Sequence, residues 1–388
     1  MAGFMQVLKF NRKAYICKFE CRRANMSRRL WATLLILISA VFLNIGSAGA
    51  CTYFFLTSGD GSVISGRTDE FYSDTGSKLN MIPRGISFAS KAPDGAKPVS
   101  WKTKYGFVGI SMFDKDLFGE GMNEKGLSAG GLWFGDVKYP AIKPGDELLS
   151  VNDVIGWILG SFQTVKEVRS ALPKVKIWSS ADNPLKIPLP MHFYVTDATG
   201  DSIVVECMDG CTKIWDNRDN GVMTNEPDLG WHLNNLRFYS HVNPDAGITP
   251  KLGGEDWALG SGIMPLPGDY SDASRFVRIS LLKRFSKQPE TAEAGVNLAL
   301  HLINTIDIPY GPQVWIQGQK GNIQWTVWSV IYDHTNKYFY YRTYENPTLR
   351  RCDLSKLNFS EGTPCKRFEL FGGSGYIDDT NRWLAPAK

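Results

Sequence analysis

A basic and apolar segment ending just before Cys51 decides which part of this chain can form a globular domain. Residues 28 and 29 are arginines, residues 30–45 are mostly apolar, and residues 48–50 read AGA. This order is typical of a secretory signal peptide cleaved after an A-x-A site. We expect translation to begin at Met26, residues 1–50 to be an extended N-terminus plus a removed signal peptide, and residues 51–388 to form a single domain.

Cleavage at this position would make Cys51 the first residue of the mature chain. A thiol has an ordinary pKa of about 8.5 and an α-amine one of about 7.7–8.0. The amine can therefore take the thiol proton near neutral pH, as it does for N-terminal threonine nucleophiles. Two other interpretations are a lipidated cysteine, although Ala48 stands where lipidation signals usually have a leucine-like residue, and a purely structural cysteine.

The composition of the segment after residue 50 argues against several function classes. Eight of the 43 Lys and Arg and one of the 39 Asp and Glu lie in residues 1–50, which leaves 35 basic and 38 acidic residues and a net charge of about −3. No basic patch for nucleic acid or anionic lipid is indicated. The five histidines show no metal-ligand spacing, and no phosphate-binding motif appears. We expect neither a metal nor a cofactor.

Five cysteines follow residue 50, and an odd number in an exported chain indicates at least one free thiol. Cys207 and Cys211 flank a turn-like sequence and could form a disulfide, as could Cys352 and Cys365. Buried, reduced cysteines are an equally good interpretation of both pairs.

Alternating and helical patterns predict two blocks of antiparallel strands with helices between them. The predicted strands cover residues 52–57, 62–67, 105–112, 127–134, 191–196, 202–207, 323–332 and 337–344. The predicted helices cover residues 148–159, 275–285 and 290–306, with another opening at the capping box Thr164-x-x-Glu167. This order predicts an α+β protein of stacked sheets covered by helices.

Two short motifs point in different directions. Residues 59–61 form a turn signal, so strand 62–67 could return Arg67 toward Cys51, where a guanidinium favours the thiolate. Residues 126–130 read GLSAG, which matches the G-x-S-x-G elbow of α/β-hydrolases. The elbow requires a helix after the serine, whereas a strand-like stretch follows here, so we regard this match as accidental.

A set of short motifs carries a family resemblance along the whole segment after residue 50. They are CT at 51–52, GRT at 66–68, GMNEKGL at 121–127, VMTNEP at 222–227, SRF at 274–276 and IPYG at 308–311. In this order and spacing the chain resembles the choloylglycine hydrolase family of N-terminal-nucleophile amidases, which includes bile salt hydrolases and penicillin V acylases. The resemblance implies a four-layer αββα sandwich.

The resemblance also implies roles for individual residues. Cys51 would be both nucleophile and base, and Arg67 would lie beside its thiol. The side-chain amide of Asn225 and the backbone N–H of Trp133 would hold the oxyanion, and Arg275 would complete the charged cluster around the N-terminus.

One position departs from the family pattern, which usually has Asp three residues after the arginine. Glu70 stands there, and Asp69 precedes it. The family spacing of three residues after the arginine favours Glu70 as the acid that anchors the α-amine. Alternation along a strand, in contrast, puts Asp69 on the face of Arg67. The choice between the two acids stays open at this point.

The substrate predicted by the resemblance is an acylated small molecule. The Trp at position 133 resembles the residue that the Gram-negative branch of the family has there, and members of that branch act on penicillin V and in several cases on N-acyl-homoserine lactones. By this resemblance, Phe71 and Trp133 would be apolar walls for the acyl group. Bile salt hydrolysis is the alternative, and an inactive exported lipoprotein or binding protein of the same fold is a third interpretation. We expect a periplasmic or secreted protein that is not inserted in a membrane, does not bind nucleic acid and forms a homo-oligomer, a tetramer by resemblance.

Overall fold

The computed structural model describes residues 50–73, 75–93, 95–244, 251–252, 255–256, 263, 265–317 and 320–384. These residues fall within one compact unit that spans residues 46–388. The predicted signal peptide before Ala50 lies outside the described residues. Among the described helices, none is both long and apolar enough to span a membrane.

A seven-stranded antiparallel sheet carries Cys51 at the start of one of its inner strands. In spatial order the strands are β15 (Val222–Met223), β1 (Thr52–Thr57), β2 (Val63–Phe71), β19 (Lys320–Asp333), β20 (Tyr338–Thr343) and β21 (Arg350–Asp353), with β18 (Gln313–Gln317) paired to β19. β1 and β2 form a hairpin in which Thr52 lies opposite Thr68. Gly61 supplies the positive φ of +85° that the turn requires.

An eight-stranded sheet provides the second half of the sandwich. Its strands, in spatial order, are β14 (Cys211–Asp216), β13 (Ser202–Met208), β12 (Met191–Thr196), β9 (Ser128–Trp133), β8 (Leu117–Asn123), β7 (Phe107–Met112), β3 (Lys78–Ile82) and β22 (Lys366–Glu369). Smaller described pairings join β5 (Lys97–Pro98), β10 (Glu147–Ser150) and β11 (Lys176–Trp178), β4 (Ser87–Ala89) with β6 (Ser100–Lys102), and β16 (Lys251–Leu252) with β17 (Glu255–Asp256).

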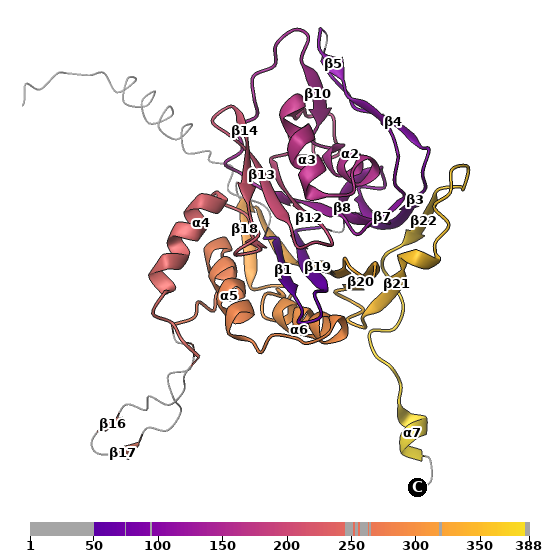
Figure 1. Cartoon of the computed structure of the whole chain (residues 1–388). Helices are drawn as coiled ribbons and strands as arrows, with labels where there is room; N and C mark the ends of the chain where they lie inside the picture. Colours follow the sequence, from indigo (N-terminus) through magenta and orange to yellow (C-terminus); the bar gives the residue numbers. More distant parts are fainter. Residues whose placement is uncertain are drawn as a thin grey trace, which may run out of the picture. The chain divides into compact units, whose positions relative to one another are not determined.

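Helices cover the outer face of each sheet, and Figure 1 shows the two helix pairs on opposite sides of the strands. α2 (Val154–Ser161) and α3 (Val165–Ala171) belong to the eight-stranded sheet, and α5 (Asp272–Phe285) and α6 (Ala292–Asn304) to the seven-stranded sheet. The remaining described α-helices are α4 (Leu229–Leu236) and α7 (Thr380–Leu384).

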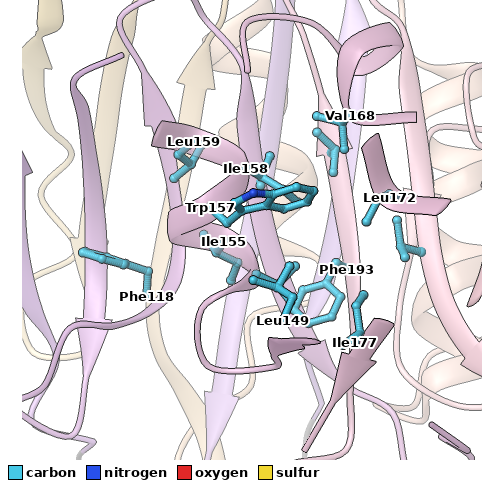
Figure 2. Close-up of a cluster of buried hydrophobic side chains, with 14 of the residues drawn as sticks. Phe118, Leu149, Ile155, Trp157, Ile158, Leu159, Val168, Leu172, Ile177 and Phe193 are labelled. Atoms are coloured by element: carbon cyan, nitrogen blue, oxygen red, sulfur yellow. The ribbon is translucent and has the colours of Figure 1, made fainter. Parts of the chain in front are cut away.

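Three apolar clusters hold the four layers together, because the alternating side chains of each strand enter two different layers. Phe107 packs toward α2 and α3, in the cluster that Figure 2 shows around Trp157. The neighbouring Val108 packs between the sheets with Trp328. Ile331 faces the other way, toward α5 and α6. The predicted α+β architecture of an αββα sandwich is therefore confirmed.

Most predicted elements are present, with one clear error. The predicted helix over residues 148–159 is wrong in its first part, because Leu148 and Leu149 belong to β10, which pairs in parallel with β11 and β5. The helix begins only at Val154. The predicted capping box is confirmed, since Thr164 Oγ1 accepts a hydrogen bond from the Glu167 N–H at the start of α3.

The cysteines and the G-x-S-x-G match also have clear outcomes. Cys207, Cys211, Cys352 and Cys365 are all free thiols, so neither possible disulfide is formed in this structure. Ser128 of the GLSAG stretch lies within β9, with its strand continuing to Trp133. The elbow geometry is therefore absent there, and the interpretation of the match as accidental is confirmed.

Candidate active site

Cys51 stands immediately before β1, and the register of the β1–β2 hairpin brings two charged residues to its thiol. Tyr53 lies opposite Arg67 and Thr52 opposite Thr68, so the register continued by one residue sets Cys51 opposite Asp69. Arg67 Nη2 is 3.8 Å from Cys51 Sγ, and Asp69 Oδ1 is 3.7 Å from it. The hairpin therefore positions a cation and an anion at the thiol, as the turn motif predicted for Arg67.

The environment of the thiol in the full-length chain favours its protonated form. Cys51 is 5% exposed, and burial raises the pKa of its thiol strongly, with a further increase from the charge of Asp69. Arg67 and a backbone hydrogen bond from Glu70 act in the opposite direction and lower the thiol pKa. Ala50, which precedes the thiol residue, is fully buried, and the Cys51 nitrogen is here a peptide nitrogen that cannot serve as a base.

Asp69 and Glu70 point to opposite faces of β2. Asp69 Oδ1 accepts a hydrogen bond of 2.9 Å from Arg67 Nη2, while Oδ2 is buried without a partner among the described residues. The Glu70 carboxylate instead accepts hydrogen bonds from Thr68 Oγ1 at 3.1 Å and Thr326 Oγ1 at 2.7 Å. The structure thus places the Asp69 carboxylate, and not that of Glu70, at the thiol. Which acid anchors an α-amine stays a prediction.

The predicted oxyanion donors lie next to each other at the end of β9. Asn225 is fully buried, and its Nδ2 donates a hydrogen bond of 2.8 Å to the Trp133 carbonyl. The Phe134 N–H donates to the Pro190 carbonyl at 2.8 Å, so Trp133 and Met191 form a non-hydrogen-bonded pair of the β9–β12 ladder. The Trp133 N–H therefore points away from β12, on the same strand edge as its carbonyl.

Arg275, on α5, bonds both to Cys51 and to Asn225. This fully buried residue donates from Nη1 to the Cys51 carbonyl at 2.6 Å and to Thr52 Oγ1. Its Nη2 donates to Asn225 Oδ1 at 2.9 Å and pairs with Asp272. Arg275 therefore orients the Asn225 amide, because a carbonyl oxygen held by the guanidinium leaves Nδ2 to face β9.

A cleft above the thiol has almost entirely apolar walls. Its volume is about 50 Å³, which is room for one or two water molecules. The predicted wall residues Phe71 and Trp133 both line it. Sequence reasoning missed the other walls, which come from the ends of β7, β8 and β12 and the segment before β12: Met112, Phe113, Leu117, Leu185, Leu189 and Met191.

A second missed residue is Glu120, which forms an ion pair of 3.0 Å with Arg67 Nη1. Its signal in the sequence was an acid inside the otherwise apolar strand at residues 117–122. Within the described part of the chain, no group of His, Cys, Asp and Glu residues has the arrangement of a metal site.

Comparisons with known proteins identify the family of this chain. The profile of the family described as linear amide C–N hydrolases, choloylglycine hydrolase family, matches residues 51–367 and so begins at Cys51. A bile salt hydrolase/transferase of Clostridium perfringens is 29% identical over 329 residues, which cover 82% of this chain and 96% of that protein. A penicillin V acylase of Pectobacterium atrosepticum is 28% identical over 359 residues, 86% of this chain and 89% of that protein.

The fold has the same relatives. The solved structure of a mutant conjugated bile acid hydrolase from Clostridium perfringens superposes with a TM-score of 0.72 at 27% identity, covering 84% of this chain and 99% of that one.

Proposed function

Because this chain belongs to the choloylglycine hydrolase family of linear amide C–N hydrolases, we propose that it uses Cys51, freed as the N-terminal residue, to hydrolyse the amide of penicillin V or of N-acyl-homoserine lactones. The observation that carries the proposal is the position of Cys51 Sγ at the base of an apolar cleft. There the thiol lies within 4 Å of Arg67 and Asp69 and close in the fold to the Asn225 and Trp133 donors.

The reaction then follows from the geometry in two halves. The free α-amine takes the thiol proton, and the thiolate attacks the carbonyl carbon of the substrate amide. The Trp133 N–H and Asn225 Nδ2 donate to the oxygen that becomes negative. When the C–N bond breaks, the α-ammonium returns the proton to the leaving nitrogen and a thioester remains. Water then attacks the thioester and gives its proton to the α-amine, which releases the acid and the thiol.

Processing of the leader is part of this proposal. The matched family region begins at Cys51, and the fully buried Ala50 is removed by cleavage at that point. Export to the periplasm, followed by cleavage between Ala50 and Cys51, would then create the base and enlarge the space beside the thiol in one step.

The walls of the cleft favour a flat aryl group or a slender alkyl chain as the acyl part. Phe71 and Trp133 offer ring faces, and methionine and leucine side chains complete the lining. A bile salt is the second candidate, because relatives named bile salt hydrolase match as well as the penicillin V acylase does.

The experiment is to express the full chain for export and to purify the processed protein. Intact mass should show Cys51 as a free, unmodified N-terminus, and a lipid-modified or uncleaved N-terminus would contradict the proposal. Penicillin V, an acyl-homoserine lactone and glycocholate are then assayed side by side.

Cys51→Ser should abolish hydrolysis. Cys207→Ser is the matched control, because Cys207 is a buried free thiol of the cluster beneath α2 and α3 and should leave the activity intact. Turnover that persists without the Cys51 thiol would show that the nucleophile is another group.

A further inference from the structure

Glu120 is a fully buried acid on β8 that contacts the active-site arginine but cannot touch a substrate. Its side chain is 0% exposed, and it is not among the residues that line the cleft. Its Oε2 accepts a hydrogen bond of 3.0 Å from Arg67 Nη1, the guanidinium nitrogen that does not contact the thiol. Glu120 and Cys51 therefore engage different nitrogens of one guanidinium group.

We propose that Glu120 is a positioning residue of the hydrolytic reaction, which acts by fixing the guanidinium of Arg67 so that Nη2 stays beside the Cys51 sulfur. The inference rests on the proposed function, in which Cys51 is the nucleophile.

The contacts of Arg67 show what Glu120 contributes. Nη2 already serves three acceptors, the thiol sulfur, Asp69 Oδ1 and the Gly131 carbonyl at 2.8 Å. The face of the guanidinium lies against Trp328, with 4.8 Å between Cζ and the ring centroid. Glu120 is the described partner of Nη1, so it opposes rotation of the planar guanidinium about the Cδ–Nε bond. Without that partner, Nη1 loses its anchor, and only the described contacts of Nη2 and the Trp328 ring oppose movement of the guanidinium away from the sulfur.

Glu120 is itself held in place by two phenols. Tyr332 Oη donates to Oε1 at 2.7 Å, and Tyr194 Oη lies 3.5 Å from Oε2. Both tyrosines are fully buried, and they come from β19 and β12, one from each sheet. The acid thus fixes Arg67 to both halves of the sandwich, whereas Asp69 fixes it only to its own strand.

Neutralising the charge of Arg67 does not by itself explain why an acid stands at position 120, because Asp69 already provides one negative charge for Arg67. Burial raises the pKa of Glu120 to about 7 despite the charge of Arg67, which lowers it. A second buried carboxylate therefore costs stability, in line with a role beyond folding.

The charged groups that shift the thiol pKa directly are Arg67, Asp69 and Glu70 on β2. The titratable and charged groups that face these three are Glu120 on β8, Tyr194 on β12, Tyr332 on β19, and Arg275 on α5, which in turn pairs with Asp272. The test consequently compares variants at one of these positions while the others are kept.

The experiment measures alkylation of Cys51 by iodoacetamide against pH, in processed protein carrying Glu120→Ala or Glu120→Gln. Glu120→Ala removes a negative charge and also releases Nη1. Because Arg67 contacts the sulfur and Glu120 does not, the loss of a fixed cation should outweigh the lost negative charge, and the pH midpoint of alkylation should rise by about one unit. Glu120→Gln keeps an acceptor oxygen for Nη1 but removes a negative charge, so the midpoint should fall. With a hydrolysed substrate, Glu120→Ala should lower kcat about tenfold to a hundredfold and leave KM nearly unchanged.

Asp333→Asn is the matched control. Asp333, on β19, is a buried carboxylate like Glu120, but among the described contacts its side chain bonds only to Asn336 in the turn that follows. This variant should change the melting temperature without moving the alkylation midpoint. A rise of the midpoint in Glu120→Gln as large as that in Glu120→Ala, or a wild-type midpoint and kcat in a folded Glu120→Ala, would overturn the proposal. Alkylation needs no substrate, so this result is independent of whether the substrates named above are hydrolysed.

Discussion

Replacement of Asp69 by asparagine should lower kcat/KM far more than replacement of Glu70 by glutamine. Asp69 Oδ1 bonds to Arg67 Nη2 at 2.9 Å and lies 3.7 Å from the Cys51 sulfur. Its buried Oδ2 has no partner among the described residues. This oxygen therefore has an unused acceptor position beside the residue whose amine cleavage before Cys51 would create.

The magnitude follows from the loss of one charge-assisted hydrogen bond. Such a bond contributes about 1.5–3 kcal/mol, which corresponds to a decrease in kcat/KM of roughly 10-fold to 150-fold. The partners of Glu70 are the hydroxyls of Thr68 and Thr326, each on a different carboxylate oxygen. A glutamine oxygen can accept from one hydroxyl while the glutamine NH2 group donates to the other. Glu70→Gln should therefore cost less than about tenfold.

The assay is steady-state hydrolysis of the preferred substrate by both processed variants, with circular dichroism to verify folding. A pH–rate profile belongs to it, because an asparagine at position 69 removes a negative charge beside the thiol. A larger loss in Glu70→Gln than in Asp69→Asn would refute the reasoning and restore the alignment-based choice of Glu70.

Three further predictions concern the oxyanion donors, the buried acids and the packing of the hairpin. Asn225→Ala should lower kcat about 10²–10³-fold with a much smaller change in KM, measured by steady-state kinetics. An increase in KM as large as the decrease in kcat would contradict the donor role. Burial raises the pKa of Glu70 to about 8, so its stabilising contribution is present below its unfolded pKa of about 4.5 and is lost as the pH rises toward 8. The melting temperature of Glu70→Gln should consequently rise relative to that of the wild type as the pH increases from about 4.5 to 8. Melting temperatures that change with pH in the same way in both proteins would contradict the raised pKa of Glu70. Gly66→Ala places a Cβ 2.6 Å from the Phe54 ring and should cost about 1–3 kcal/mol, whereas Gly268→Ala, with open space around its Cβ, should leave the calorimetric melting temperature unchanged.

Local patterns along the chain were sufficient to predict the hairpins but not the minor sheet. The strands around Tyr53 and Tyr194 alternate or are apolar throughout and are bounded by turn residues, so each is defined by its own sequence. Leu148 and Leu149 are equally apolar and precede a real helix, and only their pairing with β11 and β5 makes them a strand. That pairing depends on residues about 30 and 50 positions away, which a local window does not contain.

The same limit applied to the site. Arg67 could be placed near Cys51 because a tight turn joins their strands. Asn225 and Arg275 lie more than 170 residues further along the chain, so only the family resemblance indicated them. Glu120 was missed because a single acid in an apolar strand has no local partner, and its meaning depends on Arg67, 53 residues earlier.

The buried charges give the proposed cleavage before Cys51 a second effect. Two guanidiniums, those of Arg67 and Arg275, face four carboxylates, those of Asp69, Glu70, Glu120 and Asp272. Burial raises the pKa of all four acids, as expected where positive charge is in short supply. An α-ammonium at Cys51 would add a third positive charge beside the unpartnered oxygen of Asp69. It would thereby lower the pKa of both the acid and the thiol. The cleavage that creates the base would therefore also reduce the excess of acidic groups over positive charges in the site.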